Sequence, residues 1–132
     1  MKQISIFVEN KPGRINEVTA VLEHCNINIL AMTVADSDDY GILRLLVSDV
    51  DTAIECLKRA HFSAKVVDVI AVNVSNIKGS LNKILNLFSD GQISVEYMYG
   101  FADGAVAVLV FKTRDMVRAQ QLLKENNFQI LP

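Results

Sequence analysis

The chain has 132 residues, 51% of them apolar, with a formal net charge of −2 and two cysteines. This length suits one ordinary domain or two small ones, and the apolar fraction is enough for a packed core, which excludes a disordered chain. The small net charge, without a long Lys or Arg cluster, argues against a nucleic-acid partner. The short apolar runs argue against a signal peptide or a membrane span. We therefore expect a soluble, cytoplasmic protein.

The chain begins with a pattern typical of a strand followed by a helix. Residues 2–8 alternate apolar and polar side chains and are rich in β-branched residues. The segment 9–15 joins them to a helix expected over residues 13–24, where apolar residues recur every three or four positions. Pro12 suits a first helical turn because it needs no amide partner, and Gly13 permits a tight bend. The amides that open this helix would stabilise a carboxylate or phosphate.

The rest of the first half reads as three more strands and a second helix. Turn-forming residues separate these segments, and a polar residue stands at the start of the helix. The expected elements are a strand through 28–35, a polar turn at 36–39, a strand over 40–47, a helix capped by Asp49 or Asp51 that ends near His61, and a strand over 63–74. The last strand is too long for a single strand of so small a domain, so we expect two domains to share it.

An internal repeat explains this sharing. When the sequence of 132 residues is shifted against itself by half its length, about thirteen positions are identical, where chance gives about four or five; the pairs Asn10/Asn76 and Gly13/Gly79 are among them. The protein is therefore read as a tandem duplication with units over residues 1–66 and 67–132. Each unit is expected to be a ferredoxin-like β-α-β-β-α-β fold of the α+β class, with both helices on one face of an antiparallel sheet. Because no flexible linker separates the units, the two sheets are expected to join side by side.

The predicted strands carry apolar residues on both sides. In the second strand, Ile27, Ile29 and Ala31 alternate with Leu30, Met32 and Val34. Because helices cover only one face of the sheet, this pattern predicts an apolar patch on the other face. Exposed apolar patches of several hundred Å² mark interaction surfaces, so we expect a homodimer.

No pattern of catalytic, metal-binding or cofactor-binding residues is found. Cys25 and Cys56 lie far apart and outside any metal-ligand spacing, so we expect small apolar core residues rather than a metal or redox site. His24 and His61 follow helical patterns near their ends, which indicates surface or capping histidines. No nucleophile has a base beside it, and no Gly-rich phosphate loop is present. The sequence thus predicts neither an enzyme nor a cofactor.

The first strand, the segment Asn-Lys-Pro-Gly-Arg-Ile over residues 10–15, and Asn-Ile-Asn-Ile over residues 26–29 resemble an ACT domain, and the resemblance covers both halves. It implies a regulatory fold that in many members binds an amino acid where two units meet. The first repeat resembles the serine-binding ACT domain of phosphoglycerate dehydrogenases, which implies Asn10 and Asn28 as effector contacts. Val8 stands where those domains have a histidine, and this departure argues against serine as the ligand.

These observations together predict an amino-acid site centred on the first repeat. Backbone amides near Gly13 would take the carboxylate, carboxamides would bridge the charged groups, and methionines would shape the wall. The expected ligand-binding residues are Asn10, Pro12, Gly13, Arg14, Ile15, Asn28, Met32, Asn76 and Met98. Each has a plainer alternative: a helix cap for Asn10, a turn residue for Asn28, a solvated side chain for Arg14, and core packing for the two methionines. The second repeat has Lys78, Ser80 and Ser94 in place of Pro12, Arg14 and Asn28, which favours the first-repeat loop.

Two functions remain open at this point. The first is a stand-alone regulatory protein that binds a free amino acid at the interface between ACT units and signals to a partner, such as a metabolic enzyme. The alternative is an interaction module that docks on a metabolic enzyme through its apolar sheet face without ligand sensing.

Overall fold

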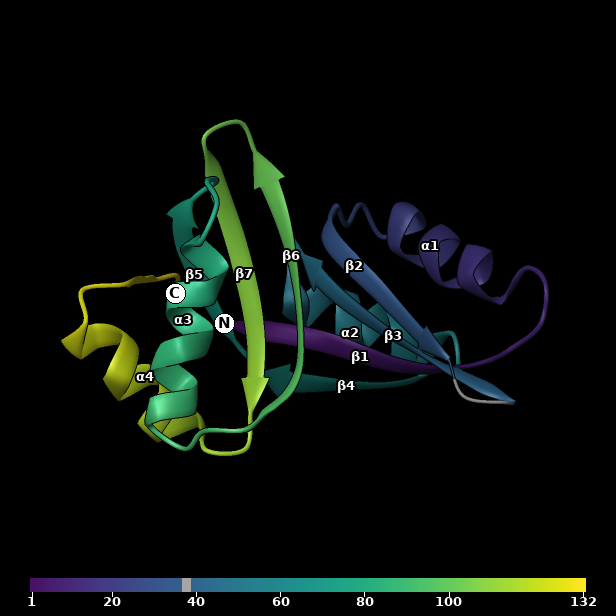
Figure 1. The fold of residues 1–132 in the computed structure, drawn as a ribbon. Helices are drawn as coiled ribbons and strands as arrows, with labels where there is room; N and C mark the ends of the chain where they lie inside the picture. Colours follow the sequence, from purple (N-terminus) through teal and green to yellow (C-terminus); the bar gives the residue numbers. More distant parts are fainter. Residues whose placement is uncertain (37–38) are drawn as a thin grey trace. The chain divides into compact units, whose positions relative to one another are not determined.

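The computed structural model describes residues 1–36 and 39–132, which form two compact units (Figure 1). The N-terminal unit is Lys2–Val67, and the C-terminal unit consists of Met1 and Asp68–Pro132. Met1 belongs with the second unit because it pairs with Val69. Its carbonyl accepts a hydrogen bond from the Val69 amide at 3.0 Å, and its ammonium group donates to the Val69 carbonyl at 3.2 Å.

The N-terminal unit has the β-α-β-β-α-β order predicted from the sequence. Its elements are β1 (Lys2–Glu9), α1 (Arg14–His24), β2 (Ile29–Asp36), β3 (Tyr40–Val47), α2 (Val50–Arg59) and β4 (Ser63–Asp68). The strands form a sheet in the order β2-β3-β1-β4, in which β3 runs antiparallel to both β1 and β2. The turn predicted at residues 36–39 includes Ser37 and Asp38, which lie outside the described residues.

The C-terminal unit repeats this order. Its elements are β5 (Ile70–Ser75), α3 (Ser80–Asp90), β6 (Val95–Asp103), β7 (Val106–Thr113), α4 (Met116–Glu125) and β8 (Gln129–Ile130), and the sheet order is β6-β7-β5-β8. The predicted tandem α+β architecture is therefore confirmed. The long strand expected over residues 63–74 is divided at Val69 into β4 and β5.

Each unit has its own core between the helices and one face of the sheet. In the N-terminal unit the inward residues of β1 and β3 meet the apolar stripes of α1 and α2; they include Ile4, Ile6, Leu43, Leu45, Val18, Leu22, Ala53 and Leu57, all fully buried. In the C-terminal unit the rings of Phe88 and Phe111 meet edge to face, with centroids 5.3 Å apart. The alternation in the strands and the helical spacing in the helices thus select the same inward face.

A β-bulge changes which side chains of β2 face the helices. The register shifts within residues 29–31, and the same shift recurs within residues 95–97 of β6. The inserted residue breaks the simple alternation, so Ile29 and Met32 both lie opposite core residues of β3, Val47 and Leu45. The expectation that Ile29 and Met32 lie on opposite faces is therefore wrong.

Every helix of the described residues ends in the same way. After α1 the amide of Asn26 donates to the Glu23 carbonyl and that of Ile27 to the Leu22 carbonyl, both at 2.9 Å. This pattern is a Schellman motif, which requires a left-handed residue just past the helix. That position is taken by Asn26 (φ 61°), His61 (φ 68°), Gln92 (φ 56°) and Asn127 (φ 62°). His61 therefore ends a helix through its backbone.

Asp49 is the residue that caps α2, which decides between the two candidates predicted. Its Oδ1 accepts from the Thr52 amide at 3.1 Å and its Oδ2 accepts from the Thr52 hydroxyl at 2.7 Å. These hydrogen bonds stabilise the ionised form and hold the pKa of Asp49 below its usual value. Asp115 caps α4 in the matching way, accepting from the Arg118 amide at 2.9 Å.

Candidate functional site

The loop between β1 and α1 bends at a glycine, as its sequence predicts. Gly13 is the N-cap of α1 and has a left-handed backbone, with φ 84° and ψ −6°. Gly79, its counterpart before α3, has φ 87°. An added Cβ would meet no atom within 4 Å at either position, so the conformation itself explains the glycine. Gly13, Pro12 and Ile15 are all exposed.

The amides of this loop are partly used within the loop. The Lys11 amide donates to the Glu9 carbonyl at 2.9 Å, and the Arg14 amide donates to the Lys11 carbonyl at 3.3 Å. Of the predicted carboxylate donors near Gly13, Arg14 and Ile15, the Arg14 amide therefore already has an acceptor. The positive end of the α1 dipole still faces the loop.

Arg14 belongs to a small network of charges around the loop. Its guanidinium donates to Glu17 Oε2 at 2.9 Å and lies 3.8 Å from Glu9 Oε2, while Lys11 Nζ lies 2.9 Å from the same Glu9 oxygen. The Glu17 carboxylate, and then Glu9, raise the pKa of Arg14. Lys11, and then Arg14, lower the pKa of Glu9. Of these four charged side chains, the anion Glu9 and the cation Arg14 border a hollow at the end of β1.

Asn10 and its counterpart Asn76 each donate a backbone hydrogen bond to the turn that precedes the third strand of their own unit. The Asn10 amide donates to the Asp39 carbonyl at 3.0 Å, and the Asn76 amide donates to the Ala105 carbonyl at 2.8 Å. The Asn76 side chain also donates from Nδ2 to the Gly104 carbonyl at 3.0 Å. The Asn76 carboxamide thus holds the turn between β6 and β7, a structural role for a residue expected to bind ligand.

Asn28 lies at the start of β2, where its backbone is fixed by Ser48. The Asn28 amide donates to the Ser48 hydroxyl at 3.0 Å, and its carbonyl accepts from the Ser48 amide at 3.0 Å. The residue is exposed and borders an open hollow of about 490 Å³, which we name the Asn28 hollow. Its lining residues are Thr19, Glu23, Asn26, Ile27, Asn28 and Ile29.

A second hollow, the loop hollow, lies where β1 ends and α1 begins. It measures about 280 Å³ and is lined by Phe7, Val8, Glu9, Arg14, Tyr40, His61, Phe62 and Ser63. The C-terminal unit has a matching hollow of about 260 Å³ lined by Asn73, Val74, Ser75, Ile77, Ser80, Lys83, Asn127, Phe128 and Gln129. Ser75 and Ser80 occupy the positions of Glu9 and Arg14 in this matching hollow. Of these two hollows, the one in the N-terminal unit therefore has the pair of opposite charges.

The two predicted methionines differ in exposure. Met98 packs against the core of the C-terminal unit, which agrees with the plainer of its two interpretations. Met32 is 41% exposed and lies on the helix-covered face of β2, opposite Leu45. Arg14 and Asn28 border different hollows of those described, and a joint site of Asn10 and Asn28 stays a prediction.

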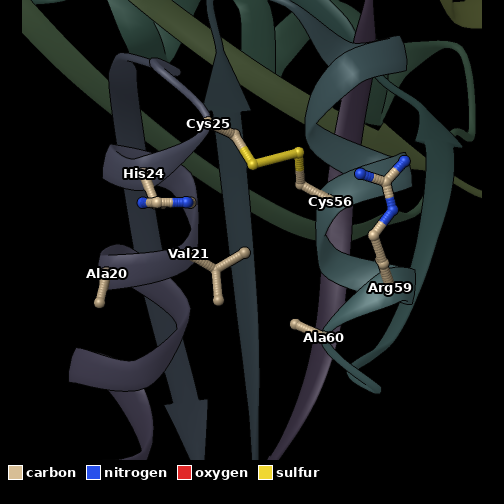
Figure 2. Close-up of a pocket in the computed structure, with 7 residues that line it drawn as sticks. All are labelled: Ala20, Val21, His24, Cys25, Cys56, Arg59 and Ala60. Atoms are coloured by element: carbon tan, nitrogen blue, oxygen red, sulfur yellow. A yellow bond between two sulfur atoms is a disulfide. The ribbon is translucent and has the colours of Figure 1, made fainter.

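The expectation of two unpaired cysteines in the core is wrong. Cys25, just after α1, and Cys56, in α2, form a disulfide, with Cα atoms 6.7 Å apart (Figure 2). Sequence spacing does not reveal the pair because the two cysteines are 31 positions apart. The available signal was their position on two helices expected to cover one sheet face. The bond borders a third hollow, the helix hollow, of about 490 Å³, lined by Ala20, Val21, His24, Cys25, Cys56, Arg59 and Ala60.

Among the described residues, no group of three or more His, Cys, Asp and Glu side chains could hold a metal ion. None of the helices in that part of the chain has the length and apolar character needed to cross a membrane.

A sequence model of the family described as "ACT domain pair" matches residues 1–132. The structure is similar to protein BT0572 of Bacteroides thetaiotaomicron, with 43% identity, a TM-score of 0.94, and coverage of 98% of this chain and 90% of that one. A search of curated protein sequences gives no match.

More distant structures share the fold. The regulatory subunit of aspartate kinase from Thermus thermophilus has 12% identity and a TM-score of 0.66, covering 94% of this chain and 90% of that one. The aspartate kinase of Clostridium acetobutylicum has 17% identity and a TM-score of 0.55, and the match covers 94% of this chain and 32% of that longer one. At these identities the likeness concerns the fold alone.

Proposed function

Because the chain belongs to the family of ACT domain pairs, we propose that it is a regulatory protein that binds a free amino acid and changes the activity of a partner protein. The family match spans the whole chain, and both units have the expected β-α-β-β-α-β order. A regulatory role requires that the ligand favour one state of the protein over another, because equal affinity for both states shifts nothing. A metabolic enzyme is the proposed partner, and the cytoplasm the proposed location.

The loop hollow is the observation that carries the amino-acid proposal. A free amino acid presents a carboxylate and an ammonium group, and the hollow offers Arg14 for the first and Glu9 for the second. Its volume of about 280 Å³ suits a ligand smaller than a drug molecule. The matching hollow has Ser75 and Ser80 at these positions, so we propose one site in the N-terminal unit.

Asn10 and Asn28 remain in the proposal as carboxamides that contact the ligand. Asn10 directly follows Glu9, and Asn28 borders a hollow at the other end of α1. No described hollow is lined by both residues. Variants at Asn10 and at Asn28 therefore test separate parts of the proposal.

Calorimetric titration with each amino acid tests ligand binding. We expect one amino acid, or a few related ones, to bind, and we expect Arg14→Gln and Asn10→Ala to weaken that binding at least about tenfold, the usual effect of losing a charge-assisted or buried polar contact. Ser80→Ala changes the matched position in the C-terminal unit and should leave the affinity unchanged. Absence of binding by every amino acid at millimolar concentration would contradict the proposal.

The interaction module is the second candidate function, favoured by one observation. Phe7 lies in β1 between the inward residues Ile6 and Val8, so its side chain is on the helix-free face, and it is 50% exposed. An exposed aromatic ring on a sheet face is suited to a protein partner or to a second copy of the chain. Phe7→Glu should then abolish capture of the partner, or prevent a homodimer from forming, as measured by light scattering. Because Phe7 also lines the loop hollow, the control is Arg14→Gln, which changes that hollow and should leave both kinds of association intact.

A further inference from the structure

The disulfide of the N-terminal unit lies where a reductant can reach it. Cys25 and Cys56 are both only partly buried, and both border the open helix hollow of about 490 Å³. Figure 2 shows the sulfur–sulfur bond at one end of this hollow, with Val21 and Ala60 farther along it. His24 and Arg59 also line the hollow and bring imidazole and guanidinium groups to the same surface.

The C-terminal unit closes the matching pair of helices without a covalent bond. The repeat places Gly91 at the position of Cys25 and Leu122 at the position of Cys56. Leu122 is 9% exposed, and a Cβ built on Gly91 would lie 2.5 Å from its Cδ1 atom. The Leu122 side chain thus fills the space beside Gly91. An apolar contact is sufficient for this fold, so the bond in the N-terminal unit is an addition to it.

We propose that Cys25–Cys56 is a reversible redox site, opened by a dithiol and closed again by a disulfide oxidant, and that opening it frees the C-terminal end of α1 from α2. The reversibility rests on the cytoplasmic location proposed above, because disulfides in reducing compartments are usually transient and regulatory rather than permanent. This inference concerns a different surface from the proposed amino-acid site and does not depend on it.

The exchange proceeds in two balanced steps. A thiolate of the dithiol attacks Cys25 Sγ; a mixed disulfide forms, the Cys25–Cys56 bond breaks, and Cys56 leaves as a thiolate that takes a proton from water. Arg59 lies three residues beyond Cys56 on α2 and lines the same hollow, and a cation near a sulfur favours its thiolate form. The second thiolate of the dithiol then attacks the dithiol sulfur of the mixed disulfide, and Cys25 leaves as a thiolate that also takes a proton from water. Two electrons and two protons have passed to the protein, and the dithiol has become a disulfide.

Opening the bond changes the constraint on α1. In the oxidised protein its C-terminal end is tied to α2 by the disulfide, in addition to the apolar contacts of Val18 and Leu22 in the core. After reduction only non-covalent contacts hold the helix, as non-covalent contacts such as those of Ile84 and Phe88 hold α3. Local opening of the segment at the end of α1 should therefore become more frequent.

Thiol labelling of the folded full-length chain tests the site. Protein purified without reductant is treated with iodoacetamide before and after incubation with dithiothreitol, and the labels are counted by mass. We expect no label before reduction and two labels after it. A reduced sample that is treated with oxidised dithiothreitol before iodoacetamide should again take no label. Two labels before reduction, or no label after reduction of the folded protein, would overturn the proposal.

Amide hydrogen exchange tests the effect on α1. We expect residues 20–28 to exchange about tenfold faster in the reduced protein, while the matched residues 86–94 keep their rate. A Cys25→Ala/Cys56→Ala variant controls for other effects of the reductant and should exchange at one rate with or without it. Equal rates for residues 20–28 in the oxidised and reduced protein would refute the loosening of α1.

Discussion

Loss of the disulfide should destabilise the N-terminal unit by an amount that follows from its loop. The bond joins residues 31 positions apart. A chain-entropy treatment of such a loop gives a stabilisation of about 3.7 kcal/mol at room temperature, because the bond restricts the unfolded chain. Domains have about 0.05–0.15 kcal/mol of stability per residue, so a unit of this size is stabilised by roughly 3–10 kcal/mol in total. The Cys25→Ala/Cys56→Ala variant should therefore be markedly less stable.

The assay is urea unfolding of the full chain. Unfolding is monitored by hydrogen exchange and mass spectrometry, so that the two units are measured separately. The free energy of unfolding of Lys2–Val67 should fall by about 3–4 kcal/mol in the variant. The unfolding of Asp68–Pro132 should change little, because this unit has the contact of Leu122 with Gly91 in place of a disulfide. Dithiothreitol should lower the stability of the natural sequence to a similar extent and leave the variant unaffected.

A small difference would refute this reasoning. If the oxidised protein and the variant differ by less than about 0.5 kcal/mol, the usual effect of a neutral surface substitution, the bond does not constrain the unfolded chain as calculated. An equal loss of stability in both units would also contradict it, because the effect should be confined to the loop that the bond closes.

Three further predictions concern the fold. Gly13→Ala and Gly79→Ala should each cost about 1 kcal/mol in unfolding free energy by urea titration, because both have left-handed backbones and open space around the missing Cβ; a neutral result would exclude strain. Thr52 holds the pKa of Asp49 in the folded protein below its value in the unfolded chain, so the cap stabilises the fold above the unfolded pKa and this stability is lost as the pH falls through the folded pKa. Melting temperatures measured from about pH 2 to 6 should therefore fall less on acidification for Asp49→Asn than for the natural sequence. An equal fall in both proteins would argue against the cap. Phe88→Ala should cost about 3–5 kcal/mol in the C-terminal unit by the same titration, since the ring is 1% exposed; a loss below about 1 kcal/mol would mean that the core had closed around the cavity.

The repeated architecture could be predicted from the sequence because its signals are local. The alternation of Ile4, Ile6 and Val8 marks a strand, and the three- and four-residue spacing from Ile15 to Leu22 marks a helix. A second copy of both patterns 66 positions later then determines the order of elements without reference to contacts.

Two features could not be predicted because they depend on one-residue or long-range geometry. The bulge at residues 29–31 gives no signal in a run where Leu30 is as apolar as its neighbours, yet it changes the side on which Ile29 lies. The disulfide requires the ends of two helices to approach within 6.7 Å between Cα atoms, and helical periodicity does not report that distance.

The candidate ligand residues show the same division. Gly13 was expected from turn chemistry, and its backbone angle agrees. Asn76 was expected from its match to Asn10, but its carboxamide is used by the Gly104 carbonyl, a contact between residues 28 positions apart. Identity between repeats indicates a shared backbone role, which is a different property from ligand contact.

The helix ends show where the sequence could be improved. At Asn26, His61, Gln92 and Asn127 a side chain is held in a left-handed turn that glycine enters at no steric cost. Natural sequences retain such residues because selection acts only below a threshold of stability. The duplicated fold could therefore be stabilised at its helix ends. Glycine at Gln92 and Asn127 should raise the melting temperature without changing a residue of the loop hollow or the Asn28 hollow, whereas His61 and Asn26 line those hollows.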